Sequence, residues 1–76
     1  MTHDQINEGG TYAGLRGVRR TVTKLAPVEP WHSEASIKRR NCSYETPNKD
    51  GTVREYTVRL DCFAKWAICD VTEVAR

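Results

Sequence analysis

The strongest constraint on the fold is a pair of strand-like segments, residues 37–45 and 52–60, joined by the turn sequence Pro-Asn-Lys-Asp-Gly. In the second segment, Tyr56, Val58 and Leu60 alternate with polar residues. This period of two is typical of a strand with one buried face. The Asp-Gly pair favours a loop of several residues built around a type I turn. We therefore predict that the two segments form a β-hairpin.

Basic residues are concentrated on the predicted hairpin and on the strand before it. The seven of interest are Arg19, Arg20, Lys38, Arg39, Arg40, Arg54 and Arg59. Because consecutive residues of a strand point to opposite faces, the run at 38–40 forms one basic surface only on a ribbon that is strongly twisted or exposed on both sides. Such a set suits the phosphates of a nucleic acid or an acidic protein face, and it also serves simple solubility. These three interpretations remain open.

A further strand is predicted at residues 18–25, after a short extended piece at residues 11–13 and a turn that contains two glycines. The segment is rich in valine and threonine, which favour strands. We expect Val22 and Leu25 both to face inward. Since the two residues are three positions apart, this arrangement requires a bulge or a twist between them.

The segment at residues 26–35 is predicted to be a loop, because Pro27 and Pro30 each lack the amide hydrogen that a central strand needs. The loop carries Trp31 and His32, which suit either a stacking platform for a base or a hydrophobic anchor for a protein. Because the domain is so small, we favour a third interpretation, in which Trp31 folds back and caps the core.

The C-terminal part predicts one helical turn and a last strand. Asp61 is a good N-cap for a helix at residues 62–67, in which Phe63 and Trp66 share one face and are expected to close the core. Residues 68–74 return to β-branched side chains and predict the final strand.

Five short strands with one helical turn before the last are typical of an all-β fold, a small SH3-like and partly open barrel that hides its sheet edges by curling. We assign this single domain to residues 10–74 and treat residues 1–9 as a mobile arm, because they are polar and lack periodicity. A chain of 76 residues buries only about 60% of its unfolded surface, so a deep catalytic cleft is not expected.

Catalysis and metal binding both fit the residues poorly. Cys42, Cys62 and Cys69 have a spacing that matches neither a zinc ribbon nor a disulfide scaffold, so we expect three buried, reduced thiols and no metal. Nucleophilic catalysis needs a base beside the nucleophile, and the chain offers only His3 and His32. We therefore expect no enzymatic activity and no cofactor.

The spacing of several small, aromatic and basic residues resembles that of short uncharacterised proteins encoded by bacteriophages and prophages. The residues that carry the resemblance are Gly10-Thr11-Tyr12, Gly14, Gly17, Arg20, Val22, Cys42 and Phe63-Ala64-Lys65-Trp66-Ala67. The resemblance covers roughly residues 10–71 and implies a small SH3-like barrel, a phage origin and a binding role, with no catalytic residues to carry over. This chain departs from the pattern in its long proline-containing loop around Trp31.

We therefore expect a small phage- or prophage-encoded binding module that acts on a host or phage protein complex, for example as an anti-defence inhibitor or accessory factor. The alternative is a nucleic-acid-binding accessory protein that uses the basic hairpin. The candidate contacts are the seven basic residues together with Trp31 and His32. No apolar run is long enough to span a bilayer, so we expect a cytoplasmic protein without a membrane partner. The oligomeric state stays open between a monomer and a dimer paired through sheet edges.

Overall fold

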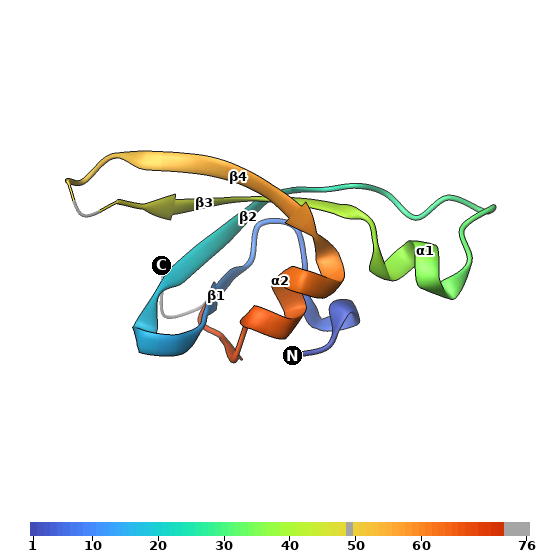
Figure 1. Cartoon of the computed structure of the whole chain (residues 1–76), viewed down its shortest axis with the longest axis horizontal. Helices are drawn as coiled ribbons and strands as arrows, with labels where there is room; N and C mark the ends of the chain where they lie inside the picture. Colours follow the sequence, from blue (N-terminus) through green and yellow to red (C-terminus); the bar gives the residue numbers. More distant parts are fainter. Residues whose placement is uncertain (49, 73–76) are drawn as a thin grey trace.

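The computed structural model describes residues 1–48 and 50–72, and its centre is one antiparallel sheet of five strands (Figure 1). The strands are β1 (Thr11–Ala13), β2 (Arg19–Leu25), β3 (Asn41–Pro47), β4 (Val53–Arg59) and β5 (Cys69–Asp70). Their order is β4-β3-β2-β1-β5, so the first four strands form a meander and β5 returns to pair with β1. The all-β prediction is confirmed, and within the described residues the sheet is open, with β4 and β5 at its edges. The last strand is shorter than predicted, and positions 73 and 74 lie outside the described residues.

The predicted hairpin is confirmed as β3 and β4. Its register places Tyr44 opposite Tyr56 and Cys42 opposite Val58. In the connecting turn, Gly51 has a φ of +89°, a conformation that favours glycine because other residues are strained there. The alternation of apolar residues in β4 therefore predicted the pairing of the two strands correctly.

The start of the hairpin differs from the prediction, because residues 34–38 form the short helix α1 (Glu34–Lys38) rather than the beginning of a strand. Ser33 is the N-cap of this helix, and its Oγ accepts a hydrogen bond from the backbone N–H of Ser36 at 3.2 Å. Strand β3 begins only at Asn41. Lys38 and Arg39 consequently lie at the end of a helix and not on the ribbon.

The predicted bulge in β2 is present. The pairing with β3 shifts register between Val22 and Lys24, so that Val22 lies opposite Tyr44 and Leu25 lies opposite Cys42. Val22 is fully buried and Leu25 packs against the core. The extra residue therefore turns both apolar side chains to the same face of the sheet.

Helix α2 (Leu60–Trp66) packs against this face of the sheet (Figure 1). It buries Leu60, Phe63 and Ala64, and the ring of Phe63 lies 5.5 Å from that of Tyr44, between ring centroids. The expected N-cap role of Asp61 is wrong, because the helix begins at Leu60 and Asp61 lies inside its first turn. The expected burial of Phe63 is confirmed.

The N-terminal segment is part of the fold, in contrast to the expected arm at residues 1–9. It contains the short 3-10 helix η1 (His3–Gln5), followed by Ile6, whose side chain is only 3% exposed and belongs to the core. The hydroxyl of Tyr12 accepts a hydrogen bond from the backbone N–H of Asn7 at 2.7 Å. The polar composition of the segment gave no sign of this packing, because only two apolar residues, Met1 and Ile6, contact the core.

The core is a single cluster between the sheet and α2. Its members are Ile6, Tyr12, Val22, Cys42, Tyr44, Leu60, Phe63, Ala64 and Ala67. Cys42 is buried as expected, whereas Cys62 and Cys69 are exposed, so the prediction of three buried thiols is wrong for two of them.

Candidate functional site

Helix α2 leaves part of its own face of the sheet open, and Arg20 and Tyr56 lie in this part, beside the buried Val22 and Tyr44. Strand register places Val22, Tyr44 and Tyr56 on the same face, and Arg20 shares that face because it lies two residues before Val22 in β2. Tyr44 is buried, Arg20 is half-buried and Tyr56 is 41% exposed. Side-chain exposure on this face therefore increases from the buried Tyr44 to the exposed Tyr56, outside the part that α2 covers.

Four side chains stack in a row that we call the aromatic–arginine row: Tyr56, Tyr44, Arg20 and Trp66. The ring centroids of Tyr56 and Tyr44 are 5.6 Å apart. The guanidinium carbon of Arg20 lies 4.7 Å from the Tyr44 centroid and 4.1 Å from the Trp66 centroid. Each cation–π contact of this kind contributes about 0.5–2 kcal/mol, depending on how far the pair is removed from water. The arginine thus contacts two aromatic rings.

Trp66 reaches this position because of a glycine. It is the last residue of α2, and its ring passes so close to Gly14 that a Cβ atom built on that glycine would lie 2.3 Å from Trp66 Cε2. Only a residue without a side chain permits this approach. Trp66 also contacts Phe63, with 5.4 Å between ring centroids. The expected core role of Trp66 therefore describes one side of the ring, and its other side supports Arg20.

The Arg20 guanidinium has an incomplete set of hydrogen bonds. Its Nε atom is buried, and no acceptor among the described residues reaches it. A buried donor without a partner costs free energy, and native proteins rarely leave one unpaired. Stacking on two rings, rather than an ion pair within the described chain, therefore sets the orientation of this side chain.

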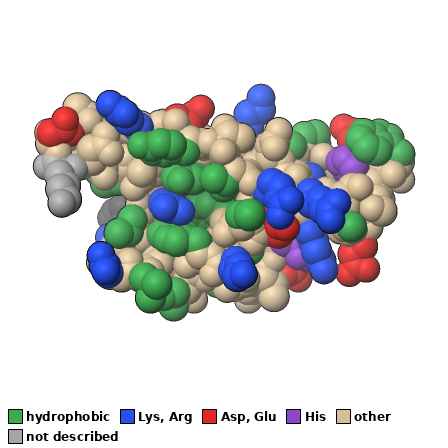
Figure 2. Space-filling model, viewed as in Figure 1, with side chains coloured by type: hydrophobic (Ala, Val, Ile, Leu, Met, Phe, Trp, Pro, Cys, Tyr) green, Lys and Arg blue, Asp and Glu red, His purple; other side chains and the backbone are tan. Residues whose placement is uncertain are grey.

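Exposed apolar side chains adjoin the Trp66 end of the row. Leu15, next to Gly14, is 75% exposed, and Ile68, two residues after Trp66, is 58% exposed. Figure 2 shows hydrophobic side chains gathered on this view of the molecule, with Lys and Arg side chains among and around them. Apolar surface interleaved with basic groups is a composition that suits a contact surface.

The basic residues predicted as contacts do not form one surface. Arg40 is used inside the fold, where its Nε donates to the carbonyl of Ile37 at 2.9 Å and its Nη1 to that of Ala26 at 2.7 Å. Arg59 pairs with Asp61 at 3.1 Å, and the guanidinium of Arg59 contributes to holding the pKa of that carboxyl below its usual value. These two arginines are therefore already engaged.

The remaining predicted basic residues are spread over different parts of the molecule. Arg19 points to the opposite face from Arg20, because the two are consecutive in β2. Arg54 is exposed and shares the face of Tyr56. Lys38 and Arg39 are exposed at the end of α1. Of the predicted set, only Arg20 and Arg54 lie on the face of the row.

Trp31 and His32 form a separate exposed feature. Trp31 is 77% exposed, so the expectation that it caps the core is wrong. Its ring meets that of His32 edge-on, with 4.1 Å between centroids and 62° between the ring planes, and Nδ1 of His32 accepts a hydrogen bond from the backbone N–H of Glu29 at 2.9 Å. The segment that carries them leads into α1 at one end of the elongated molecule, away from the β3–β4 turn (Figure 1).

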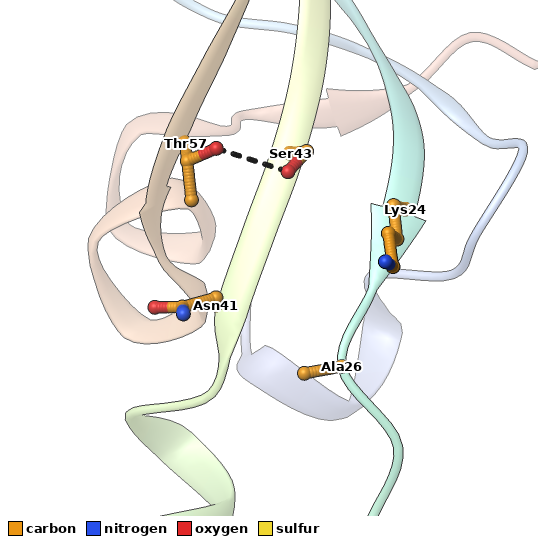
Figure 3. A pocket seen from close by; sticks show the side chains of 5 residues that line it. All are labelled: Lys24, Ala26, Asn41, Ser43 and Thr57. Atoms are coloured by element: carbon orange, nitrogen blue, oxygen red, sulfur yellow. Dashed lines mark hydrogen bonds between the residues drawn. The ribbon is translucent and has the colours of Figure 1, made fainter.

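The opposite face of the sheet is polar and holds a pocket of about 310 Å³ (Figure 3). Its lining residues are Lys24, Ala26, Asn41, Ser43 and Thr57. The hydroxyls of Ser43 and Thr57 are 3.0 Å apart and bond to each other. The lining contains no carboxylate, imidazole or thiol, the groups on which acid–base or covalent catalysis most often depends.

Sequence reasoning missed Tyr44, Tyr56 and Trp66 as members of the aromatic–arginine row. The signal for the two tyrosines was present, because the hairpin register puts them opposite each other on one face. The signal for Trp66 was absent from the local sequence, since its exposed side depends on the distant residues Gly14 and Arg20.

Comparison of the chain with protein-family models, with curated proteins and with solved structures found no match, so the resemblance to phage proteins stays a prediction. Within residues 1–48 and 50–72, no helix has the length and apolar character needed to cross a membrane. In the same part of the chain, no three His, Cys, Asp or Glu side chains come together as metal ligands.

Proposed function

We propose that this protein is a binding module without catalytic activity, which acts by covering a surface of another protein. The observation that carries the proposal is the aromatic–arginine row on a partly open face of the sheet. Tyrosine, tryptophan and arginine are the residue types that dominate the binding energy of protein–protein contacts. Here they are already stacked on one another, so little side-chain entropy remains to be lost when a partner binds.

A protein partner suits this surface better than a nucleic acid. Base stacking needs free aromatic faces, and Arg20 already occupies one face of Tyr44 and one of Trp66. Phosphate binding needs several free cations, but Arg40 and Arg59 are engaged within the fold. The alternative role as a nucleic-acid-binding accessory protein therefore has fewer free basic residues than we expected from the predicted basic hairpin.

The type of barrel, the phage origin and the kind of target are proposed from the topology and from the sequence resemblance. The return of β5 to β1 after a helix that follows β4 supports an SH3-like, partly open barrel. The motifs within residues 10–71 support a phage or prophage origin, with a host or phage protein complex in the cytoplasm as the target and an anti-defence or accessory role.

The test is an affinity capture from lysate of the source cells, with and without nuclease treatment, using matched variants. Tyr56→Ala removes an exposed member of the row, and Glu45→Ala changes an exposed residue on the opposite face of β3. We expect one dominant protein that survives nuclease, is retained by Glu45→Ala and is weakened by roughly 2 kcal/mol or more in Tyr56→Ala. Loss of every partner on nuclease treatment, or equal retention by both variants, would contradict the proposal.

A further inference from the structure

We propose that Arg20 is the recognition site for a carboxylate carried by an acidic segment of the partner protein. The inference rests on the proposed function and specifies the chemistry of the partner. It starts from an unusual arginine, which contacts two aromatic rings and lacks a hydrogen-bond acceptor at its buried Nε within the described residues.

The two rings limit how a ligand can reach the guanidinium. Its carbon lies 4.7 Å from the Tyr44 centroid and 4.1 Å from the Trp66 centroid, so an anion must approach where neither ring lies. Edge-on approach is the geometry in which a carboxylate accepts two parallel hydrogen bonds from an arginine. Arg20 is half-buried and its Nε atom is buried, so the two Nη atoms are the donors that remain for a ligand. The two rings therefore hold the Arg20 guanidinium in one orientation before the ligand binds.

The surroundings strengthen such a pair. The two aromatic rings shield part of the guanidinium from water, and a charge pair gains strength as the local dielectric constant falls. Because the rings also restrict the arginine rotamers, binding loses less conformational entropy than it would at a freely moving surface arginine.

Charge on this face complements an acidic segment. Arg54 shares the face with Arg20, and strand register places it opposite Thr46 on β3. The side-chain hydroxyl of Thr46 bonds to the carbonyl of Arg19, which ties this position to β2. By contrast, Glu45 and Glu55 pair with each other in register and point to the opposite face. The acids of β3 and β4 therefore point away from Arg20 and Arg54, whereas Asp70 of β5, which pairs with Tyr12, shares their face.

A phosphate of a nucleic acid is the competing ligand for the same edge. A nucleic acid draws its affinity from many phosphates and from stacked bases. Among the strand residues of β2–β4, this face offers two arginines, and its rings already contact Arg20, so a carboxylate-bearing protein segment fits it better.

The experiment uses the full chain labelled with ¹⁵N, and it follows the Arg20 Nε–Hε signal by NMR. The probes are an acetylated deca-glutamate peptide, a deca-glutamine peptide as the neutral control, and a deca-thymidylate oligonucleotide. We expect saturable shifts of the Arg20 signal with deca-glutamate only. Arg20→Lys keeps the charge but loses the planar fork, and should weaken the binding by roughly tenfold. Arg19→Lys makes the same change on the opposite face, and should leave the affinity within about twofold.

Absence of a shift with deca-glutamate would overturn the inference, as would equal weakening by the two lysine variants or stronger binding of the oligonucleotide. The shift in the unmodified protein does not depend on whether a variant folds, and circular dichroism checks each variant. If a partner is captured and lost in Tyr56→Ala but retained in Arg20→Lys, the carboxylate inference fails and the proposed function stands. If no partner depends on Tyr56, the proposed function itself fails.

Discussion

Arg20 and Trp66 lie in contact, with 4.1 Å between the guanidinium carbon and the indole centroid. The contact joins strand β2 to the last residue of α2, so it links the sheet to the helix that covers it. One pair of residues therefore contributes both to the packing of the helix and to the proposed binding surface.

Replacing Gly14 by alanine should destabilise the protein by about 1–3 kcal/mol, because the new Cβ would lie 2.3 Å from Trp66 Cε2 and the ring must move. Urea unfolding of Gly14→Ala measures the cost. The control is a double-mutant cycle with Trp66→Ala, in which the clash no longer exists and Gly14→Ala should cost much less. Strict additivity of the two changes would contradict this account.

Trp31→Ala should change the free energy of unfolding by no more than about 0.5 kcal/mol, because the side chain is 77% exposed and lies outside the core. Phe63→Ala, which empties a position that is 1% exposed, should cost about 3–5 kcal/mol in the same thermal or urea unfolding measurement. A large loss of stability in Trp31→Ala would mean that its loop packs against the domain.

The cysteines should differ in reactivity. Cys62 and Cys69 are exposed and should be alkylated by iodoacetamide in the folded protein, whereas Cys42 is buried and should react only after unfolding in urea. Mass spectrometry of the intact protein counts the modified thiols. Under native conditions, Cys42→Ala should show the same number of modified thiols as the wild-type protein. Modification of all three thiols in the folded wild-type protein would contradict the burial of Cys42.

Stability should also fall at alkaline pH because of Cys42. Burial raises the pKa of its thiol from 9.0 to about 11, so the unfolded chain loses this proton before the folded chain does. The contribution of the protonated thiol to stability is complete below pH 9.0 and is lost progressively as pH rises towards about 11.

The measurement is urea unfolding of the wild-type protein and Cys42→Ala at several pH values in this range. Because both proteins share every other titrating group, the difference between their free energies of unfolding should shrink as pH rises. A difference that stays constant with pH would show that the thiol does not titrate differently in the folded protein.

Local sequence patterns predicted the strands where the alternation was clear. Val58 and Tyr56 indicated the inward face of β4, and the three-residue spacing of Val22 and Leu25 indicated the bulge in β2. The patterns failed for α1, whose five residues carry only a short N-cap signal at Ser33. Arg40 beside it was assigned to a binding surface, because nothing local indicates that its guanidinium bonds to the carbonyl of Ala26.

The sequence by itself determined the antiparallel hairpin, the bulge and the order of strands and closing helix, because these features depend on alternation and turn residues within a few positions. Only the tertiary structure decided which charged and aromatic side chains meet. Arg20 is stacked between Tyr44 and Trp66 because strand pairing brings β3 beside β2 and because Gly14 leaves room for the indole ring. Such a contact depends on segments far apart in the chain, whose approach is set by burial of the shared core rather than by any local pattern.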